Sequence, residues 1–228
     1  MLERSKVQGL GMTSLRTRQR LLERLTEKGI KDIRVLEAMR DTPRHIFLDE
    51  ALASRAYEDL ALPIGYQQTI SQPYIVARMT EILIEDKKLE SQPIDKALEV
   101  GTGCGYQAAI LSRFSKSVLT IERIKALHDK AAKNLKKLKV RNVKLLFDDG
   151  SDLIEAKENY DAILYAAAPL EVPTYFLDKL AIGGRLVAPI GGGEVQDLSL
   201  IKRLSKNKYE TEVVEQVLFV PFLGGTVE

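Results

Sequence analysis

The sequence is poor in the residues that hold metals and disulfides: its 228 residues include one cysteine, two histidines and no tryptophan. The lone cysteine, Cys104, excludes an intramolecular disulfide and a cysteine zinc cluster. His45 and His128 are too few for a multi-histidine metal site. We therefore expect no bound metal, and we assign both histidines to structural or surface positions.

Long hydrophobic runs and an excess of one charge are also missing. No apolar run approaches the ~20 residues that a membrane span requires, and residues 1–6 lack the hydrophobic region of a secretory signal. Because 34 lysines and arginines nearly balance 32 acidic residues, charge alone indicates neither a nucleic acid nor a membrane partner. The lysines of residues 123–141 fit a solvated helix face, since no aromatic residues are interleaved with them. We expect a cytoplasmic monomer that binds neither nucleic acid nor membrane.

What the sequence does contain is a regular alternation of strands and helices from residue 96 onward. Strands are predicted at 97–100, 118–121, 143–147, 160–166 and 185–190, and helices at 106–114, from about 123 to 138, and at 176–180. This alternation predicts βαβ units around a parallel sheet, which the right-handed crossover rule turns into a doubly wound α/β layer. The two-residue period of residues 198–204 and 211–220 predicts a hairpin-like pair that extends the sheet.

The first 60 residues predict a helical preface to this sheet. Apolar residues at helical spacing lead to Gly29, which is typical of a helix end. Asp32 can cap a second helix, which must end near Pro43. No linker rich in glycine, serine or proline separates the preface from the sheet, so we expect a single domain over residues 1–228.

Residues 60–71 are predicted to form a loop with a little strand, because Pro63 and Gly65 interrupt an apolar stretch. Pro73 then suits the first turn of a further helix. Ser71, two residues before this proline, is well placed to cap that helix.

A glycine loop follows the first predicted strand of the sheet, with glycines at 101, 103 and 105. The dinucleotide fingerprint would require its third glycine at position 106, which is Tyr106 here. Glu99 precedes the loop and would repel a pyrophosphate. The loop therefore suits a cofactor with a positive or neutral group, such as S-adenosylmethionine, better than a dinucleotide.

Acidic residues end the next two predicted strands. Glu122 is placed to accept hydrogen bonds from ribose hydroxyls, the role of acidic residues in nucleotide-binding sheets generally. Asp149, followed by Gly150, is placed to accept from the adenine amino group. Together with the glycine loop, these residues predict a ligand site at the carboxyl edge of the sheet.

Several short motifs resemble one family in particular. They are ALPIG at 61–65, QTISQP at 68–73, VARM at 76–79, LEVGTGCGYQ at 98–107 and AAP at 167–169. Over about residues 15–221 the chain resembles the protein-L-isoaspartate O-methyltransferases. This resemblance implies a seven-stranded methyltransferase sheet, S-adenosylmethionine as donor, and isoaspartyl-containing proteins and peptides as partners. Methylation of the free isoaspartyl carboxylate would then start repair through a succinimide.

The resemblance also implies roles for particular residues. Ser71 matches the family's active-site serine, and Thr69 and Ile70 match neighbouring contacts to cofactor and substrate. The loop after the fourth strand borders the isoaspartyl group, which implies substrate contacts at Ala167 and Pro169. The implied cofactor contacts are Glu99, Gly101, Gly103, Gly105, Glu122, Asp149 and Gly150.

On this basis residues 61–95 are expected to form the substrate and active-site segment, 96–190 the cofactor-binding core, and 191–228 the C-terminal strands. The chain departs from the family pattern at three positions. Gln67 replaces a usual glycine, Cys104 a common serine, and Ala166 a common threonine, which removes one hydroxyl near the substrate.

A carboxylate with a pKa near ~4 is already ionised at neutral pH, so methyl transfer to it requires positioning rather than a general base. We therefore expect Ser71 to orient the carboxylate or the cofactor. A rival function is methylation of nitrogen in nucleic acid or protein, but residues 166–169 offer no Asp or Asn to accept from an amine. A second rival is a regulator that binds nucleotide without catalysis.

Overall fold

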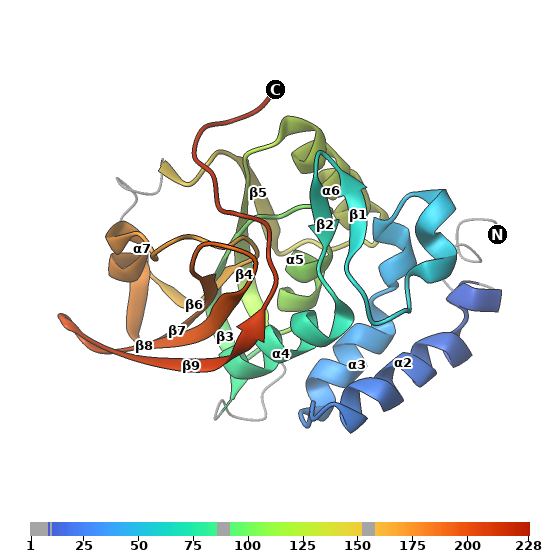
Figure 1. Ribbon diagram of the computed structural model, residues 1–228, viewed down its shortest axis with the longest axis horizontal. Helices are drawn as coiled ribbons and strands as arrows, with labels where there is room; N and C mark the ends of the chain where they lie inside the picture. Colours follow the sequence, from blue (N-terminus) through green and yellow to red (C-terminus); the bar gives the residue numbers. More distant parts are fainter. Residues whose placement is uncertain (1–8, 10, 86–91, 152–157) are drawn as a thin grey trace.

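The computed structural model describes residues 9, 11–85, 92–151 and 158–228. Seven strands form one sheet in the order β5-β4-β3-β6-β7-β8-β9 (Figure 1). Strands β3 to β7 run parallel to one another, β8 pairs antiparallel with β7, and β9 pairs antiparallel with β8. The strands are β3 (Ile94–Val100), β4 (Ser115–Glu122), β5 (Val143–Phe147), β6 (Tyr160–Tyr165), β7 (Leu180–Ile190), β8 (Gln196–Ser205) and β9 (Lys208–Val217). The predicted doubly wound, mostly parallel seven-stranded sheet is confirmed.

Helices cover both faces of the sheet. Successive residues of a strand point to opposite faces, so neighbouring residues of β3 pack against different helices. Ala97 of β3 packs in a core cluster that includes α4, α5 and α6, whereas its neighbour Leu98 packs in a second cluster with Phe176 of α7. The helices are α4 (Pro73–Ile84), α5 (Tyr106–Leu111), α6 (Lys125–Lys137) and α7 (Thr174–Lys179).

The predicted helical preface packs against the first of these clusters. Leu25, Val35 and Phe47 from the preface are buried in the same cluster as Ile110 of α5. Its elements are η1 (Gly11–Thr13), α2 (Leu15–Glu27), α3 (Ile33–Asp41), η2 (Arg44–Phe47) and η3 (Glu50–Arg55). Asp32 caps α3 as expected, its carboxylate accepting from the backbone N–H of Arg34 at 2.9 Å.

The loop with a little strand expected over residues 60–71 contains a two-stranded hairpin. Strands β1 (Leu62–Gly65) and β2 (Gln68–Ile70) pair antiparallel. Tyr66 and Gln67 connect them with φ of 54° and 57°, which is the pattern of a type I′ turn. Tyr66 and Gln67 do not indicate this turn, because asparagine and glycine are the residues that usually mark it.

The fifth parallel strand is longer than predicted. It begins at Leu180 instead of residue 185, so that Gly183 and Gly184 lie inside β7 rather than before it. A Cβ on Gly184 would lie 2.8 Å from the carbonyl oxygen of Ala181. The pairing with β6 also shifts register between Tyr160 and Ala162. The two glycines therefore accommodate an irregularity within the strand.

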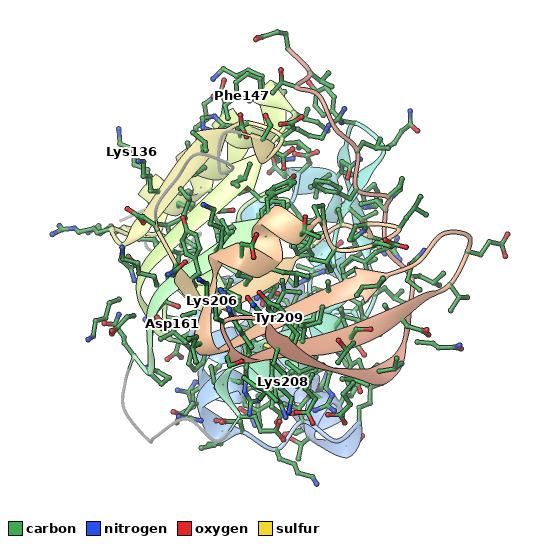
Figure 2. The ribbon with its side chains drawn as sticks, turned by 90° about the vertical axis from the view of Figure 1, so that its left-hand side faces the viewer. Lys136, Phe147, Asp161, Lys206, Lys208 and Tyr209 are labelled. Carbon is green, nitrogen blue, oxygen red and sulfur yellow. The ribbon has the colours of Figure 1, made fainter. Side chains whose placement is uncertain are left out.

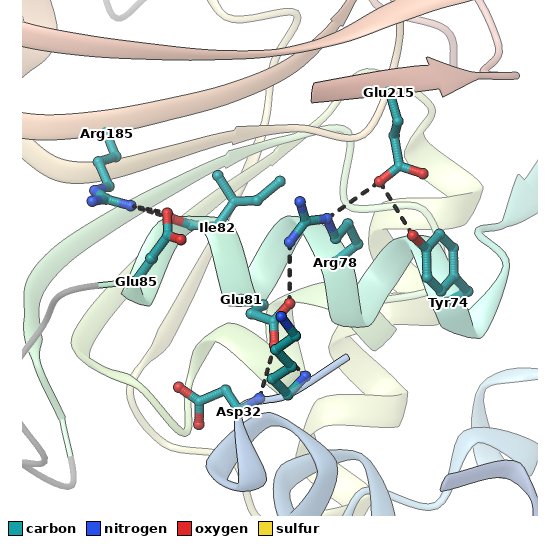
Figure 3. A network of polar contacts seen from close by, with 9 residues as sticks. Asp32, Tyr74, Arg78, Glu81, Ile82, Glu85, Arg185 and Glu215 are labelled. Atoms are coloured by element: carbon teal, nitrogen blue, oxygen red, sulfur yellow. Dashed lines mark hydrogen bonds and ion pairs between the residues drawn. The ribbon is translucent and has the colours of Figure 1, made fainter. Parts of the chain in front are cut away.

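Helix α4 is fastened to three other parts of the fold by the polar network in Figure 3. Arg78 contacts Glu215 of β9 at 3.3 Å. The Glu81 carboxylate accepts from the backbone N–H of Asp32 at 2.8 Å, at the start of α3. Arg185 of β7 donates to the carbonyl oxygen of Ile82 at 2.7 Å. The helix that follows Ser71 is thereby held in place against the preface, β7 and β9.

Candidate active site

One pocket lies where the parallel strands end, at the carboxyl edge of the sheet. Figure 2 shows this direction: Phe147, the last residue of β5, lies near the top of the view, and Asp161, at the start of β6, lies lower. The hairpin β1–β2 and residues 220–223 complete the wall. The predicted site residues that line the pocket are Thr69, Ile70, Ser71, Gly101, Gly103, Glu122, Asp149 and Ala167.

Glu122 joins the glycine loop to the start of α6. Its two carboxylate oxygens accept from the backbone N–H groups of Gly103 at 2.7 Å and Ile124 at 2.9 Å. Burial raises the pKa of Glu122, and these two N–H groups oppose that rise. The carboxylate lines the pocket at the end of β4, where it was predicted to meet ribose hydroxyls.

Glu99 lies beneath the loop instead of lining the pocket. Its carboxylate accepts from the Thr120 hydroxyl at 2.5 Å, and that hydroxyl also contacts the hydroxyl of Thr102, which does line the pocket, at 2.6 Å. The other oxygen, Oε1, is buried without a hydrogen-bond partner in the described part of the chain. Burial raises the pKa of Glu99 to about 8. Glu99 therefore lies behind two threonines, and the cofactor contact expected of it stays a prediction.

Two of the predicted cofactor glycines face other helices rather than the pocket. Gly105 has φ of 89°, and a Cβ there would lie 3.2 Å from that of Ala131 in α6. Gly150 has φ of 98°, and its Cβ would lie 2.9 Å from the ring of Phe176. Both positions require glycine for backbone conformation and close packing. Pro169 is likewise outside the lining, where its carbonyl oxygen accepts from Gly191 at 3.0 Å.

Ser71 lines the pocket, but the prediction that it caps α4 is wrong. The N-cap is Gln72, without a side-chain cap bond. Asp59 bonds the N-terminus of α4 instead. Its carboxylate accepts from the backbone N–H of Tyr74 at 2.8 Å, and its carbonyl oxygen accepts from the side-chain amide of Gln72 at 2.9 Å. Lys28 forms an ion pair with Asp59 at 2.5 Å. The Ser71 hydroxyl is consequently left without a protein partner among the described residues.

The C-terminal segment, residues 218–227 (Figure 1, red), contributes Val220 to Leu223 to the pocket wall, and these were not predicted as site residues from the sequence. The backbone N–H of Ala168 donates to Val220 at 2.8 Å, and that of Phe222 donates back to Ala168 at 2.7 Å. Asp149 accepts from the backbone N–H of Gly225 at 2.6 Å, and this bond contributes most to lowering the Asp149 pKa. These residues lack a local periodic pattern, so only their distant partners define their position.

Other lining residues were not predicted as site residues. They are Gln68, Val76, Val100, Thr102, Cys104, Tyr106, Gln107, Ile121, Arg123, Ile124, Asp148 and Ala166. Most flank predicted residues in the same loops. Within the described ranges, no group of three or more potential ligands comes together as a metal site, and no helix is both long and apolar enough to cross a membrane.

The sheet topology and this pocket, in which carboxylates outnumber cations at the strand ends, define a Rossmann-like methyltransferase. Residues 16–227 match the family model for protein-L-isoaspartate(D-aspartate) O-methyltransferase. The chain belongs to that family.

Individual proteins agree with this assignment. A protein-L-isoaspartate O-methyltransferase from Pseudomonas paraeruginosa is 53% identical over 216 residues, covering 95% of this chain and 100% of its own. One from Cellvibrio japonicus is 53% identical over 222 residues, covering 96% and 97%. A solved Plasmodium falciparum structure described as a protein-L-isoaspartate O-methyltransferase, in complex with S-adenosyl-L-homocysteine, has a TM-score of 0.76 at 26% identity, covering 90% of this chain and 97% of its own.

Proposed function

We propose that this chain transfers a methyl group from S-adenosylmethionine to the free carboxylate of L-isoaspartyl residues in damaged proteins and peptides. Family membership supports this reaction. The structural observation that carries it is one pocket in which the acidic strand ends meet the Ser71 segment of the hairpin.

The pocket residues fit S-adenosylmethionine as the donor. Glu122 and Asp149 place two carboxylates at the strand ends, and Gly101 and Gly103 let the loop backbone pass close beneath a ligand. A Cβ on Gly103 would lie 3.2 Å from Ile64 of the hairpin, so this part of the loop is tightly packed. When bound, the donor supplies an electrophilic methyl group on a sulfonium. S-adenosyl-L-homocysteine, the ligand of the solved Plasmodium falciparum protein, is the demethylated form of this donor.

The remaining task of the protein is to position the acceptor and exclude water. An isoaspartyl carboxylate is ionised at neutral pH without a base. Ser71 and Thr69, from the hairpin side, offer hydroxyls to orient it, while Phe222 and Leu223 cover the opposite side with apolar surface. Such positioning contributes much of the rate in a transfer between two bound groups.

A methyl-transfer assay tests the proposal directly. The protein, with tritium-labelled S-adenosylmethionine, is given an isoaspartyl peptide or its normal aspartyl twin. We expect label only in the isoaspartyl peptide, in a form released as methanol by mild base, because it is an ester. Base-stable label would indicate nitrogen methylation, and equal labelling of the two peptides, or none, would contradict the proposed function.

Other expectations concern the molecule as a whole. A single domain is supported by the buried cluster that runs from Leu25 of the preface to Leu164 of the sheet. The predictions of a monomer, of a cytoplasmic location and of no binding to nucleic acid rest on the sequence and stay predictions.

A further inference from the structure

Arg44, in η2, is a fully buried cation without a carboxylate partner. Its side chain is 0% exposed, and Nη2 donates to the carbonyl oxygen of Leu60 at 3.3 Å. Its Nε and Nη1 groups have no hydrogen-bond partner, and no ion pair of the described residues includes it. Burial lowers the pKa of Arg44, yet an arginine stays charged in proteins. A neutral side chain of similar size would avoid this desolvation cost. Stability of the fold alone therefore does not account for a charged side chain at this position.

The guanidinium lies directly behind the pocket wall. Its central carbon is 5.1 Å from the centre of the Tyr106 ring, and Tyr106 lines the pocket. The Phe47 ring packs edge-on against the same ring at 5.3 Å, which fixes it from a second side. Leu60 lies just before the hairpin that carries Ser71. Arg44 therefore stands behind the hairpin side of the pocket.

The charge of Arg44 reaches the glycine loop. Burial raises the pKa of the Cys104 thiol to about 11, and the positive charges of Arg44 and Lys130 oppose this rise. Lys130 is itself paired with Asp49 at 2.8 Å, which weakens its field. Arg44 forms no such ion pair: the Asp59 carboxylate interacts with its charge from beyond ion-pair distance, and Asp59 is itself paired with Lys28 at 2.5 Å. The field of Arg44 is therefore weakened less than that of Lys130.

The two sides of the pocket thus carry opposite charge. Glu122, Asp148 and Asp149 line it at the strand ends and outnumber the one lining cation there, Arg123, whose guanidinium donates to the carbonyl oxygens of Gly225 and Gly224. Carboxylates there suit a cationic donor, but they repel an anionic acceptor. A positive charge on the hairpin side offsets that repulsion where the acceptor must approach.

We propose that Arg44 is a positioning residue that draws the acceptor carboxylate to the Ser71 side of the pocket, acting through its charge behind Tyr106 without touching the substrate. This inference rests on the proposed function. It explains how a pocket lined by carboxylates can bind the isoaspartyl carboxylate, which is also negatively charged.

The chemistry of the transfer predicts which kinetic constant Arg44 controls. A carboxylate oxygen supplies the electron pair of the new oxygen–carbon bond, and the sulfur keeps the pair of the broken sulfur–carbon bond. The negative charge of the carboxylate and the positive charge of the sulfonium both disappear as the transfer proceeds. A nearby cation therefore stabilises the bound carboxylate more than the transition state, so Arg44 should lower KM without raising kcat.

The test compares Arg44→Met, Arg44→Gln and Arg44→Lys with Arg18→Met as a matched control. Arg18 is also a buried arginine of the preface, 5.7 Å from the Tyr57 ring, and it does not line the pocket. Each variant is assayed with the isoaspartyl peptide, and the Kd of S-adenosylhomocysteine is measured by calorimetry. A peptide of the same sequence with that carboxylate capped as a carboxamide serves as a neutral competitive inhibitor.

We expect Arg44→Met and Arg44→Gln to raise KM for the isoaspartyl peptide by about tenfold, the order expected for a unit charge acting over roughly 10 Å in a protein. The inhibition constant of the carboxamide peptide and the Kd of S-adenosylhomocysteine should stay near the wild-type values, and kcat should not fall, because the lost charge stabilised the bound carboxylate more than the transition state. Arg44→Lys keeps the charge and should restore KM, and Arg18→Met should leave KM unchanged. The unfolding temperature of Arg44→Met should not fall, because an unpaired buried charge has been removed.

An unchanged KM in the neutral variants would overturn the inference. So would an equal loss of affinity for carboxylate and carboxamide, or a parallel fall in unfolding temperature, kcat and cofactor affinity, which would indicate a purely structural residue. If the neutral variants do not fold, the wild-type protein alone still tests the inference. Equal affinity of the wild type for the carboxylate and carboxamide peptides would exclude recognition of the carboxylate charge. A wild type that fails to methylate the isoaspartyl peptide would instead refute the proposed function.

Discussion

Asp149, just after β5, accepts a hydrogen bond at 2.6 Å from the backbone N–H of Gly225. Arg123, just after β4, donates from Nε to the carbonyl oxygen of the same Gly225 at 2.8 Å. One residue of the C-terminal segment is thereby held from two strand ends at once. Because Val220 to Leu223 of this segment line the pocket, these two bonds help to fix a wall of the candidate site.

Acid should release this contact. The bond to Gly225 lowers the pKa of Asp149 below its ordinary value of 3.8. A lowered pKa means that the stabilisation is present above the ordinary value and is lost as the pH falls through the lowered one. We therefore expect protection of the Gly225 amide from hydrogen exchange to be maintained at pH 6 and to fall below about pH 4.

In Asp149→Ala the Gly225 amide should exchange faster than in wild type at pH 6, and the difference should narrow below about pH 4, where the wild type loses the same contact. Amides in the middle of β4 should be unaffected. Protection of Gly225 that is equal in wild type and variant at pH 6 would show that the carboxylate does not hold the segment.

Ser71→Ala should separate catalysis from stability. Because Asp59 rather than Ser71 bonds the start of α4, the variant should keep its unfolding temperature and its affinity for S-adenosylhomocysteine. Its turnover with an isoaspartyl peptide should fall about tenfold or more, because a group that orients the acceptor is lost. Near-normal turnover would remove Ser71 from the candidate machinery.

Asp59→Ala is the matched control for this experiment. It removes a helix-end contact of the kind that contributes about 1 kcal/mol, and it also breaks the ion pair with Lys28. We expect a lower free energy of unfolding in Asp59→Ala and not in Ser71→Ala. The reverse result would return the capping role to Ser71.

The sheet could be predicted from the sequence because its signals are local. An apolar strand such as 143–147, an acidic strand end such as Glu122 and the glycines of the loop each lie within a few residues of one another. The capping role of Asp59 and the bond between Asp149 and Gly225 depend on partners distant along the chain. Gly105 was expected to meet a ligand, yet its need for glycine comes from α6, which no local pattern indicates.

The backbone conformation of Gln67 is also set by the hairpin rather than by the residue type, and this allows a simple stability test. It has φ of 57°, a left-handed conformation that costs a residue with a Cβ roughly 1–2 kcal/mol. Gln67→Gly should therefore raise the free energy of unfolding by about 1 kcal/mol. Gln67→Ala retains the Cβ and should give no such gain. Chemical denaturation of the three proteins measures the difference, and equal gains in both variants would exclude backbone strain as the cause.

Glu99 should make the protein less stable as the pH rises. Burial raises its folded-state pKa from an ordinary value of 4.5 to about 8. Between these values the folded protein keeps a proton that the unfolded chain has released, so the free energy of unfolding falls with increasing pH across this window.

Glu99→Gln cannot ionise and retains an amide oxygen for the Thr120 hydroxyl. Its unfolding temperature relative to wild type should therefore increase by several degrees between pH 5 and pH 8.5, about the shift expected for a few kcal/mol in a chain of this size. Thermal unfolding at both pH values measures this, with Glu158→Gln, an exposed carboxylate, as the control that should show no such trend. A difference between Glu99→Gln and wild type that does not change with pH would mean that Glu99 titrates normally in the fold.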